Sequence, residues 1–130
     1  MSKTPTPKRT RKRASSPIVP PEVGFGVAAA LDKQAVDLVV LDLRKAGAFT
    51  DFFIVCTGNN TRQVQAIADA IQSSLGKKGT KPTLVEGETR SEWILIDYFD
   101  FVFHIFAPAT REFYGLERLW GDAESIELPA

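Results

Sequence analysis

The sequence predicts an α/β fold in which helices flank a mixed sheet of about five strands. Three observations support this prediction. Apolar runs of five to seven residues, a usual length for a strand, recur along the chain. Longer segments between them carry apolar residues at helical spacing. The two kinds of segment alternate, an order typical of helices packed against a sheet.

The first half of the chain supplies one helix and two strands. Residues Glu22–Leu31 are small and apolar and predict a short helix. Asp37–Leu43 is rich in leucine and valine and predicts a strand that is buried on both faces. After Gly47, which marks the connection, Phe52–Cys56 predicts a second buried strand. The turn residues up to Asn59 end this strand.

A long amphipathic helix follows, and both of its ends are marked. Asn60 is a typical N-cap, and Gln63 stands where a capping box has its second residue. Apolar residues lie at positions i, i+3, i+4, i+7 and i+11, namely Val64, Ile67, Ala68, Ile71 and Leu75. Gly76 and Gly79 end the helix. Residues Pro82–Gly87 then predict a short strand.

The C-terminal third predicts a hairpin followed by a helix. Trp93–Tyr98 and Phe101–Phe106 are apolar runs of strand length that flank Phe99 and Asp100. Pro108 favours a helix start, and Gly121 favours a left-handed helix end. One face of this helix is expected to pack on the sheet: Ala109, Phe113, Leu116 and Trp120.

The formal net charge is zero, yet the charges are unevenly placed. Six of the 16 Lys and Arg residues lie within the first 13 residues, whereas all 16 Asp and Glu residues lie from Glu22 onward. Residues 1–21 therefore predict a disordered, basic, proline-rich tail, residues 22–123 an acidic α/β domain, and residues 124–130 a flexible C-terminal tail. An acidic domain disfavours DNA and suits a basic partner protein. A weak contact of the basic tail with RNA stays open.

Targeting signals are weak in this sequence. The single cysteine, Cys56, excludes an internal disulfide and is compatible with a reducing compartment. No apolar run approaches the length of about 20 residues that a membrane span needs. The N-terminus lacks the apolar core of a secretory signal, and its five prolines oppose the amphipathic helix of an organellar transit peptide.

Four residues offer candidate chemistry, and each has a more ordinary interpretation. Glu86 and Glu88 end a strand two residues apart, as the metal-binding carboxylates of a nucleotidyltransferase do, but a turn with two solvated acids is the commoner case. Cys56 and His104 are each unique and could form a catalytic dyad, but both lie in apolar runs typical of a buried core. We therefore predict no catalytic residue, no metal site and no cofactor.

Polar and aromatic residues surround the predicted hairpin turn. The carboxylates of Asp97 and Asp100 could do acid–base chemistry, stabilise the turn, or present negative charge to a basic partner. Trp93 begins the first strand of the hairpin and Tyr98 ends it. Aromatic side chains at such places either cover the core or anchor a partner.

Several motifs of the chain resemble the ribosomal silencing factor (RsfS, Iojap) family. The motifs in the first part are Phe49-Thr50-Asp51, Thr57-Gly58, Arg62–Asp69, Glu86-Gly87 and Trp93–Asp100. Those in the last part are Val102, His104, Phe106, Arg111, Phe113-Tyr114, Leu116–Trp120 and Asp122-Ala123. The resemblance covers about Val23 to Ala123, which is nearly the whole predicted domain.

This resemblance implies a fold related to nucleotidyltransferases but without their catalytic residues, and a function without catalysis. It implies a factor that binds the large ribosomal subunit through universal ribosomal protein fourteen, blocks joining of the small subunit and so represses translation. It also implies a link to large-subunit biogenesis and frequent homodimers, and relatives in organelles as well as in bacteria. A bacterial and an organellar origin both stay open, and we favour the bacterial cytoplasm. The alternatives are a metal-dependent nucleotidyltransferase that uses Glu86 and Glu88, and an interaction domain with a non-ribosomal partner.

Within the ribosomal hypothesis, the residues around the hairpin form the partner-binding surface. Trp93 and Tyr98 are expected to act as anchors, and Asp97 and Asp100 as charge partners of a basic protein. Three further residues match the family motif and are expected to support the structure: His104, Arg111 and Trp120.

Overall fold

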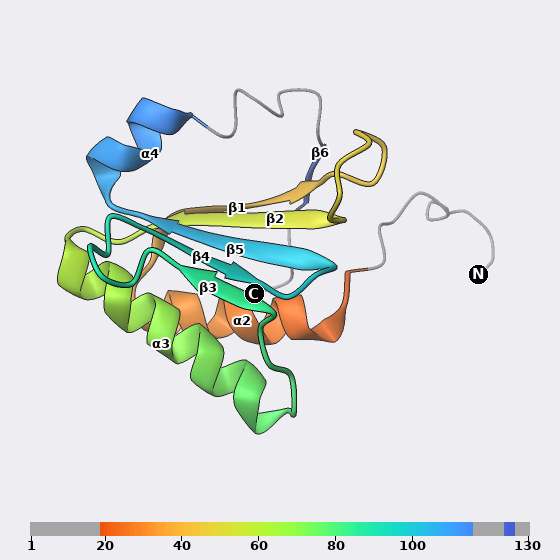
Figure 1. The fold of residues 1–130 in the computed structure, drawn as a ribbon, viewed down its shortest axis with the longest axis horizontal. Helices are drawn as coiled ribbons and strands as arrows, with labels where there is room; N and C mark the ends of the chain where they lie inside the picture. The colour runs from red at the N-terminus through yellow and green to blue at the C-terminus, as the bar shows by residue number, and fades with distance from the viewer. Residues whose placement is uncertain (1–18, 116–123, 127–130) are drawn as a thin grey trace.

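The computed structural model describes residues 19–115 and 124–126. Their helices are α2 (Pro21–Asp32), α3 (Thr61–Lys77) and α4 (Pro108–Tyr114). Their strands are β1 (Val36–Asp42), β2 (Phe52–Thr57), β3 (Leu84–Glu86), β4 (Trp93–Asp97), β5 (Phe101–Phe106) and β6 (Glu124–Ile126). The strands form one sheet in the order β3-β4-β5-β2-β1-β6. Figure 1 shows this sheet and the helices around it, with the elements labelled.

The sheet is mixed, as the sequence predicts. β2 and β5 run parallel and pair from Phe52 with Phe101 to Thr57 with Phe106. The other neighbouring strands run antiparallel, including the β4–β5 hairpin. β6 pairs with β1 over three residues, so residues 124–126, which the sequence places in a flexible tail, belong to the sheet.

Helices α2 and α3 cover one face of the sheet, whereas α4 lies on the other side (Figure 1). We call these the helix-covered face and the α4 face. The helix-covered face contributes alternate residues of each central strand to the larger core cluster, including Phe52, Ile54, Cys56, Ile94, Ile96, Phe103 and Ile105. The α4 face contributes the intervening residues to a smaller cluster, including Leu41, Phe53, Val55, Val102 and Phe106.

The structure confirms the predicted long helix and its start. The side-chain oxygen of Asn60 accepts a hydrogen bond from the backbone N–H of Gln63 at 2.9 Å. The Gln63 side chain in turn accepts from the backbone N–H of Asn59 and donates to the carbonyl oxygen of Lys33. The five residues of the predicted apolar stripe are all buried against the sheet and α2. The capping residues therefore fasten the start of α3 to the end of α2.

Two expectations about the remaining elements were wrong. β1 is buried on both faces only near its end, because its first residues, Val36 and Asp37, are exposed. The helix that begins at Pro108 ends at Tyr114 rather than near Gly121, because Gly115 adopts a left-handed conformation (φ 58°) and donates its N–H to the carbonyl oxygen of Arg111. This short helix buries no residue, so the apolar face predicted for it does not exist within the described residues.

Several predictions fall outside the described residues. These are the basic tail up to residue 18, and the part of the last predicted helix that includes Leu116 and Trp120. In the described part of the chain, no helix has both the length and the apolar character needed to cross a bilayer.

Candidate functional site

Trp93, at the start of β4, is the centre of an aromatic cluster on the α4 face. Its half-buried ring stacks on Phe106, with the ring centroids 5.0 Å apart, and contacts Tyr114 of α4 at 4.8 Å. Its indole Nε1–H donates a hydrogen bond to Nδ1 of His104 at 3.1 Å. These contacts from two elements, β5 and α4, fix the orientation of the indole ring while leaving part of it accessible. A tryptophan held in this way can anchor a partner with little loss of side-chain freedom.

His104 lies beneath this cluster in β5 and is only 3% exposed. Because Nδ1 accepts from Trp93, the proton of the neutral imidazole must sit on Nε2. Burial lowers the pKa of His104 to about 4, so the ring is neutral at physiological pH and keeps its acceptor. Among the described residues, Nε2 has no hydrogen-bond partner. The hydrogen bond from Trp93 therefore ties the indole ring to the buried His104.

Asp97 ends β4 and shares the α4 face with Trp93, because strand residues at even spacing point to the same side. Its Oδ1 accepts a hydrogen bond from the backbone N–H of Phe99 at 2.7 Å. The carboxylate therefore stabilises the β4–β5 turn and is also half-exposed to solvent. Asp100, in the turn itself, is exposed, and its carbonyl oxygen accepts from the backbone N–H of Asp51.

Tyr98 lies on the opposite side of the sheet. Its side chain is 7% exposed and stacks on Phe101, with ring centroids 5.1 Å apart, within the larger core cluster. Burial raises the pKa of its hydroxyl to about 12, and the hydroxyl has no hydrogen-bond partner among the described residues. The structure thus brings Trp93 and Asp97 to one face, places Asp100 at the adjoining turn, and separates Tyr98 from them.

Arg111 connects α4 to the sheet. Its Nη1 donates to the carbonyl oxygen of Asp37 at 2.7 Å and to Oγ1 of Thr57 at 2.8 Å. These bonds join α4 to β1 and β2, two strands far from it in sequence. Arg111 therefore helps to hold α4, and with it Tyr114, beside Trp93.

The other candidate chemistry is not assembled. Cys56 pairs with Ile105 across β2 and β5, so its side chain points to the helix-covered face, whereas His104 points to the α4 face. Burial also raises the pKa of the Cys56 thiol to about 12, which keeps it protonated. Glu86 ends β3, and Gly87 (φ 91°) turns the chain before Glu88, so the two carboxylates do not belong to one regular strand. Among the described residues, no group of three His, Cys, Asp or Glu side chains could hold a metal ion.

Sequence reasoning missed two members of this surface. Leu95 lies between Trp93 and Asp97 on the same face and is half-buried. The period of two along β4 could have identified Leu95, and it could also have shown that Tyr98 points the other way. Tyr114 reaches Trp93 only because α4 folds back over the sheet, and no local signal in the sequence predicts that contact.

Comparison with known proteins shows what class of protein this arrangement belongs to. Residues 20–130 match the model of the family described as "Ribosomal silencing factor during starvation". The chain therefore belongs to the ribosomal silencing factor family, whose members are named as regulators rather than as enzymes.

The relatives include bacterial and plant proteins. The chain is 40% identical over 104 residues to the Ribosomal silencing factor RsfS of Halalkalibacterium halodurans, an alignment that covers 80% of this chain and 89% of the relative. It is 38% identical over 102 residues to the chloroplastic protein Iojap of Zea mays, covering 78% of this chain and 44% of the relative. A crystal structure of a Chromobacterium violaceum protein superposes with a TM-score of 0.77 at 32% identity, covering 88% of this chain and 92% of that one.

Proposed function

We propose that this protein represses translation by binding the large ribosomal subunit through universal ribosomal protein fourteen and thereby blocking the joining of the small subunit. We place this activity in the bacterial cytoplasm. The mechanism needs no catalysis, because a protein that occupies a subunit surface excludes the other subunit by its volume alone. Membership of the ribosomal silencing factor family supports the ribosome as the target.

One structural observation supports the proposal most directly. Trp93, Leu95 and Asp97 lie on the same face of β4, and each is half-buried, so each still offers surface to a partner. A fixed aromatic anchor beside an apolar side chain is typical of the centre of a protein–protein interface, and a carboxylate at its rim can pair with a basic partner. We refer to these three residues as the β4 surface. Asp100 adds a second carboxylate at the adjoining turn.

The charge of the domain favours a basic protein as the partner. From Glu22 onward the chain has 16 acidic residues and ten basic ones, a net charge of −6. Such a domain is repelled by the phosphates of ribosomal RNA but is attracted to basic ribosomal proteins, which lie exposed among them. In this proposal Tyr98 is not an anchor. Its ring stacks on Phe101 in the core and so supports the turn that carries Asp97 and Asp100.

The experiment compares two substitutions that remove one negative charge each. Asp97→Asn keeps an oxygen that can accept from the Phe99 N–H, so the turn should persist while the charge is lost. Asp32→Asn removes a charge at the exposed end of α2, on the other side of the sheet. We expect Asp97→Asn to weaken binding to large subunits about tenfold and Asp32→Asn to leave it nearly unchanged.

Binding and function are measured separately. Sedimentation through a sucrose gradient reports whether the protein travels with the large subunit, and calorimetry with purified universal ribosomal protein fourteen identifies the contact. Light scattering of mixed subunits reports whether the protein inhibits their joining. Wild-type protein that leaves subunit joining unchanged would contradict the proposal. Equal binding by the Asp97→Asn and Asp32→Asn variants would contradict the β4 surface.

The homodimer that the family resemblance implies stays a prediction. Sedimentation equilibrium of the purified protein across a range of concentrations tests it directly. A mass that stays at that of a single chain would exclude it in solution.

A further inference from the structure

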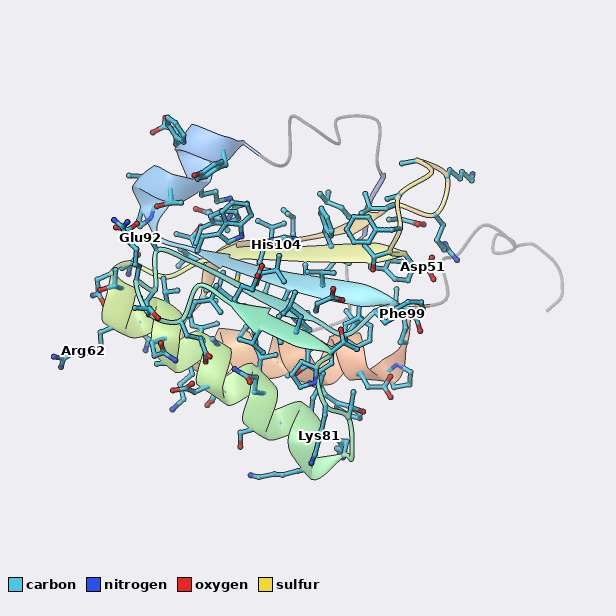
Figure 2. The ribbon with its side chains drawn as sticks, viewed as in Figure 1. Asp51, Arg62, Lys81, Glu92, Phe99 and His104 are labelled. Carbon is cyan, nitrogen blue, oxygen red and sulfur yellow. The ribbon has the colours of Figure 1, made fainter. Side chains whose placement is uncertain are left out.

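Two turns meet at the end of the sheet that lies farthest from α4. The connection between β1 and β2 carries Phe49, and the β4–β5 turn carries Phe99. The hydroxyl of Thr50 donates to the carbonyl oxygen of Phe99 at 2.8 Å, and the backbone N–H of Asp51 donates to that of Asp100 at 3.0 Å. Figure 2 shows Asp51 and Phe99 at this end. We call Phe49, Asp51, Phe99 and Asp100 the sheet tip.

Both phenylalanines of the sheet tip point away from the core. Phe49 is 81% exposed and Phe99 is 70% exposed. A single exposed apolar side chain is ordinary on a protein surface. Here, however, two large aromatic side chains occupy neighbouring turns that hydrogen bonds hold together. They therefore form a joint apolar projection whose backbone is already ordered, which lowers the entropy lost when a partner binds.

The backbone of Phe99 adopts a conformation that disfavours phenylalanine. Its φ is +75°, and the N–H of Asp100 donates to the carbonyl oxygen of Tyr98 at 3.0 Å around it. This is the rare and strained form of the γ-turn, in which glycine would avoid the steric cost of a side chain. The Phe99 side chain thus neither packs in the core nor suits its own backbone. The contacts among the described residues therefore do not account for a large apolar side chain at this position.

The charges around the sheet tip are mainly negative. Asp51, Asp97 and Asp100 lie on these turns or beside them. On the same connection as Phe49, Arg44 forms a bidentate ion pair with Asp42, with nitrogen–oxygen distances of 2.9 and 2.7 Å. Lys45 is the other cation of this connection. Since Arg44 is already paired with Asp42, the three carboxylates of Asp51, Asp97 and Asp100 outnumber the one further cation, Lys45.

We propose that the sheet tip binds a basic protein surface of the large ribosomal subunit. Phe49 and Phe99 would pack against the aliphatic stems of lysine and arginine side chains, whose charged ends would pair with Asp51 and Asp100. This inference rests on the proposed function and extends its contact surface from β4 to the turns. Asp97 and Asp100 make the two regions continuous.

The test uses a substitution for which folding and binding should change in opposite directions. Phe99→Gly suits a positive φ, so we expect the variant to melt at a higher temperature than the wild type. We also expect it to bind large subunits about tenfold more weakly, because an interface anchor is lost. Phe49→Ser should weaken binding in the same way without changing the strained turn. Leu31→Ser is the control, since it removes an exposed apolar side chain of α2 that is 51% exposed.

Titration of large subunits against the full-length variants measures their affinities. Wild-type affinity in both Phe99→Gly and Phe49→Ser would overturn the inference; the proposed function would survive if Asp97→Asn still bound weakly. Failure of the wild type to bind large subunits would instead overturn the proposed function. A change from dimer to monomer in the tip variants, with unchanged affinity for the subunit, would show that the tip pairs two copies of the chain and would also overturn the inference.

Discussion

Replacement of Trp93 by phenylalanine isolates one hydrogen bond of the aromatic cluster. The variant keeps a ring that can stack on Phe106 but loses the indole N–H that His104 accepts at 3.1 Å. His104 is 3% exposed, so water cannot easily replace the lost donor. A buried acceptor without a partner costs about 1–3 kcal/mol, and the smaller ring loses roughly 1 kcal/mol of apolar burial. We expect a total loss of about 2–4 kcal/mol in the free energy of unfolding.

Urea denaturation followed by far-UV circular dichroism measures this loss. In a domain of this size, 2 kcal/mol corresponds to a fall of roughly 8–16 °C in the melting temperature. The double variant Trp93→Phe/His104→Leu contains neither polar group of the pair. It should therefore be more stable than the sum of the two single changes predicts, by about 1 kcal/mol or more. A Trp93→Phe variant within about 0.5 kcal/mol of the wild type, or strict additivity, would refute the reasoning.

Three further predictions concern stability. Burial lowers the pKa of His104 from 6.5 to about 4. At a pH between these two values, the folded state therefore binds fewer protons than the unfolded state. The free energy of unfolding should therefore fall by about 2 kcal/mol from pH 7 to pH 5 in urea titrations, and His104→Leu should lack this fall. Gly87→Ala should lower the free energy of unfolding by at least ~2 kcal/mol in the same titrations, because φ is +91° and the new Cβ would overlap the Trp93 carbonyl oxygen. Gly24→Ala is the control, since its new Cβ meets no atom within 4 Å. Asn60→Ala should cost about 1 kcal/mol in thermal melts, whereas Asn60→Asp should keep the cap and most of the stability.

Local patterns predicted the elements whose signals lie within a few residues. Asn60 and Gln63 mark the start of α3, and the apolar stripe that follows fixes its buried face. The apolar runs Phe52–Cys56 and Phe101–Phe106 are both buried strands, as expected from their composition. Patterns of this kind succeed because the physical cause, spacing along one element, is itself local.

The errors arose where distant contacts or competing signals decide the outcome. Gly115 and Gly121 can each end a helix, and no local rule selects between them; the structure uses Gly115. The three residues of β6 are too few to show a period, and their pairing with β1 is non-local. For the candidate site, sequence reasoning proposed Trp93 and Asp97, which the structure places on one face of β4. The Trp93–His104 hydrogen bond could not be predicted, because it depends on the register of β4 against β5.

The parallel pairing of β2 with β5 affects the order in which the chain can fold during its synthesis. β1 can pair with β2 early, since the two strands are joined by a short connection. The other edge of β2 can pair only after β5 has been synthesised, because α3, β3 and β4 lie between β2 and β5 in the chain. Until then an uncharged, strongly β-forming segment, Phe52–Cys56, has an unsatisfied edge of backbone N–H and carbonyl groups. The nascent protein therefore passes through a stage at which self-association competes with folding, and this stage ends only when residues 101–106 have emerged.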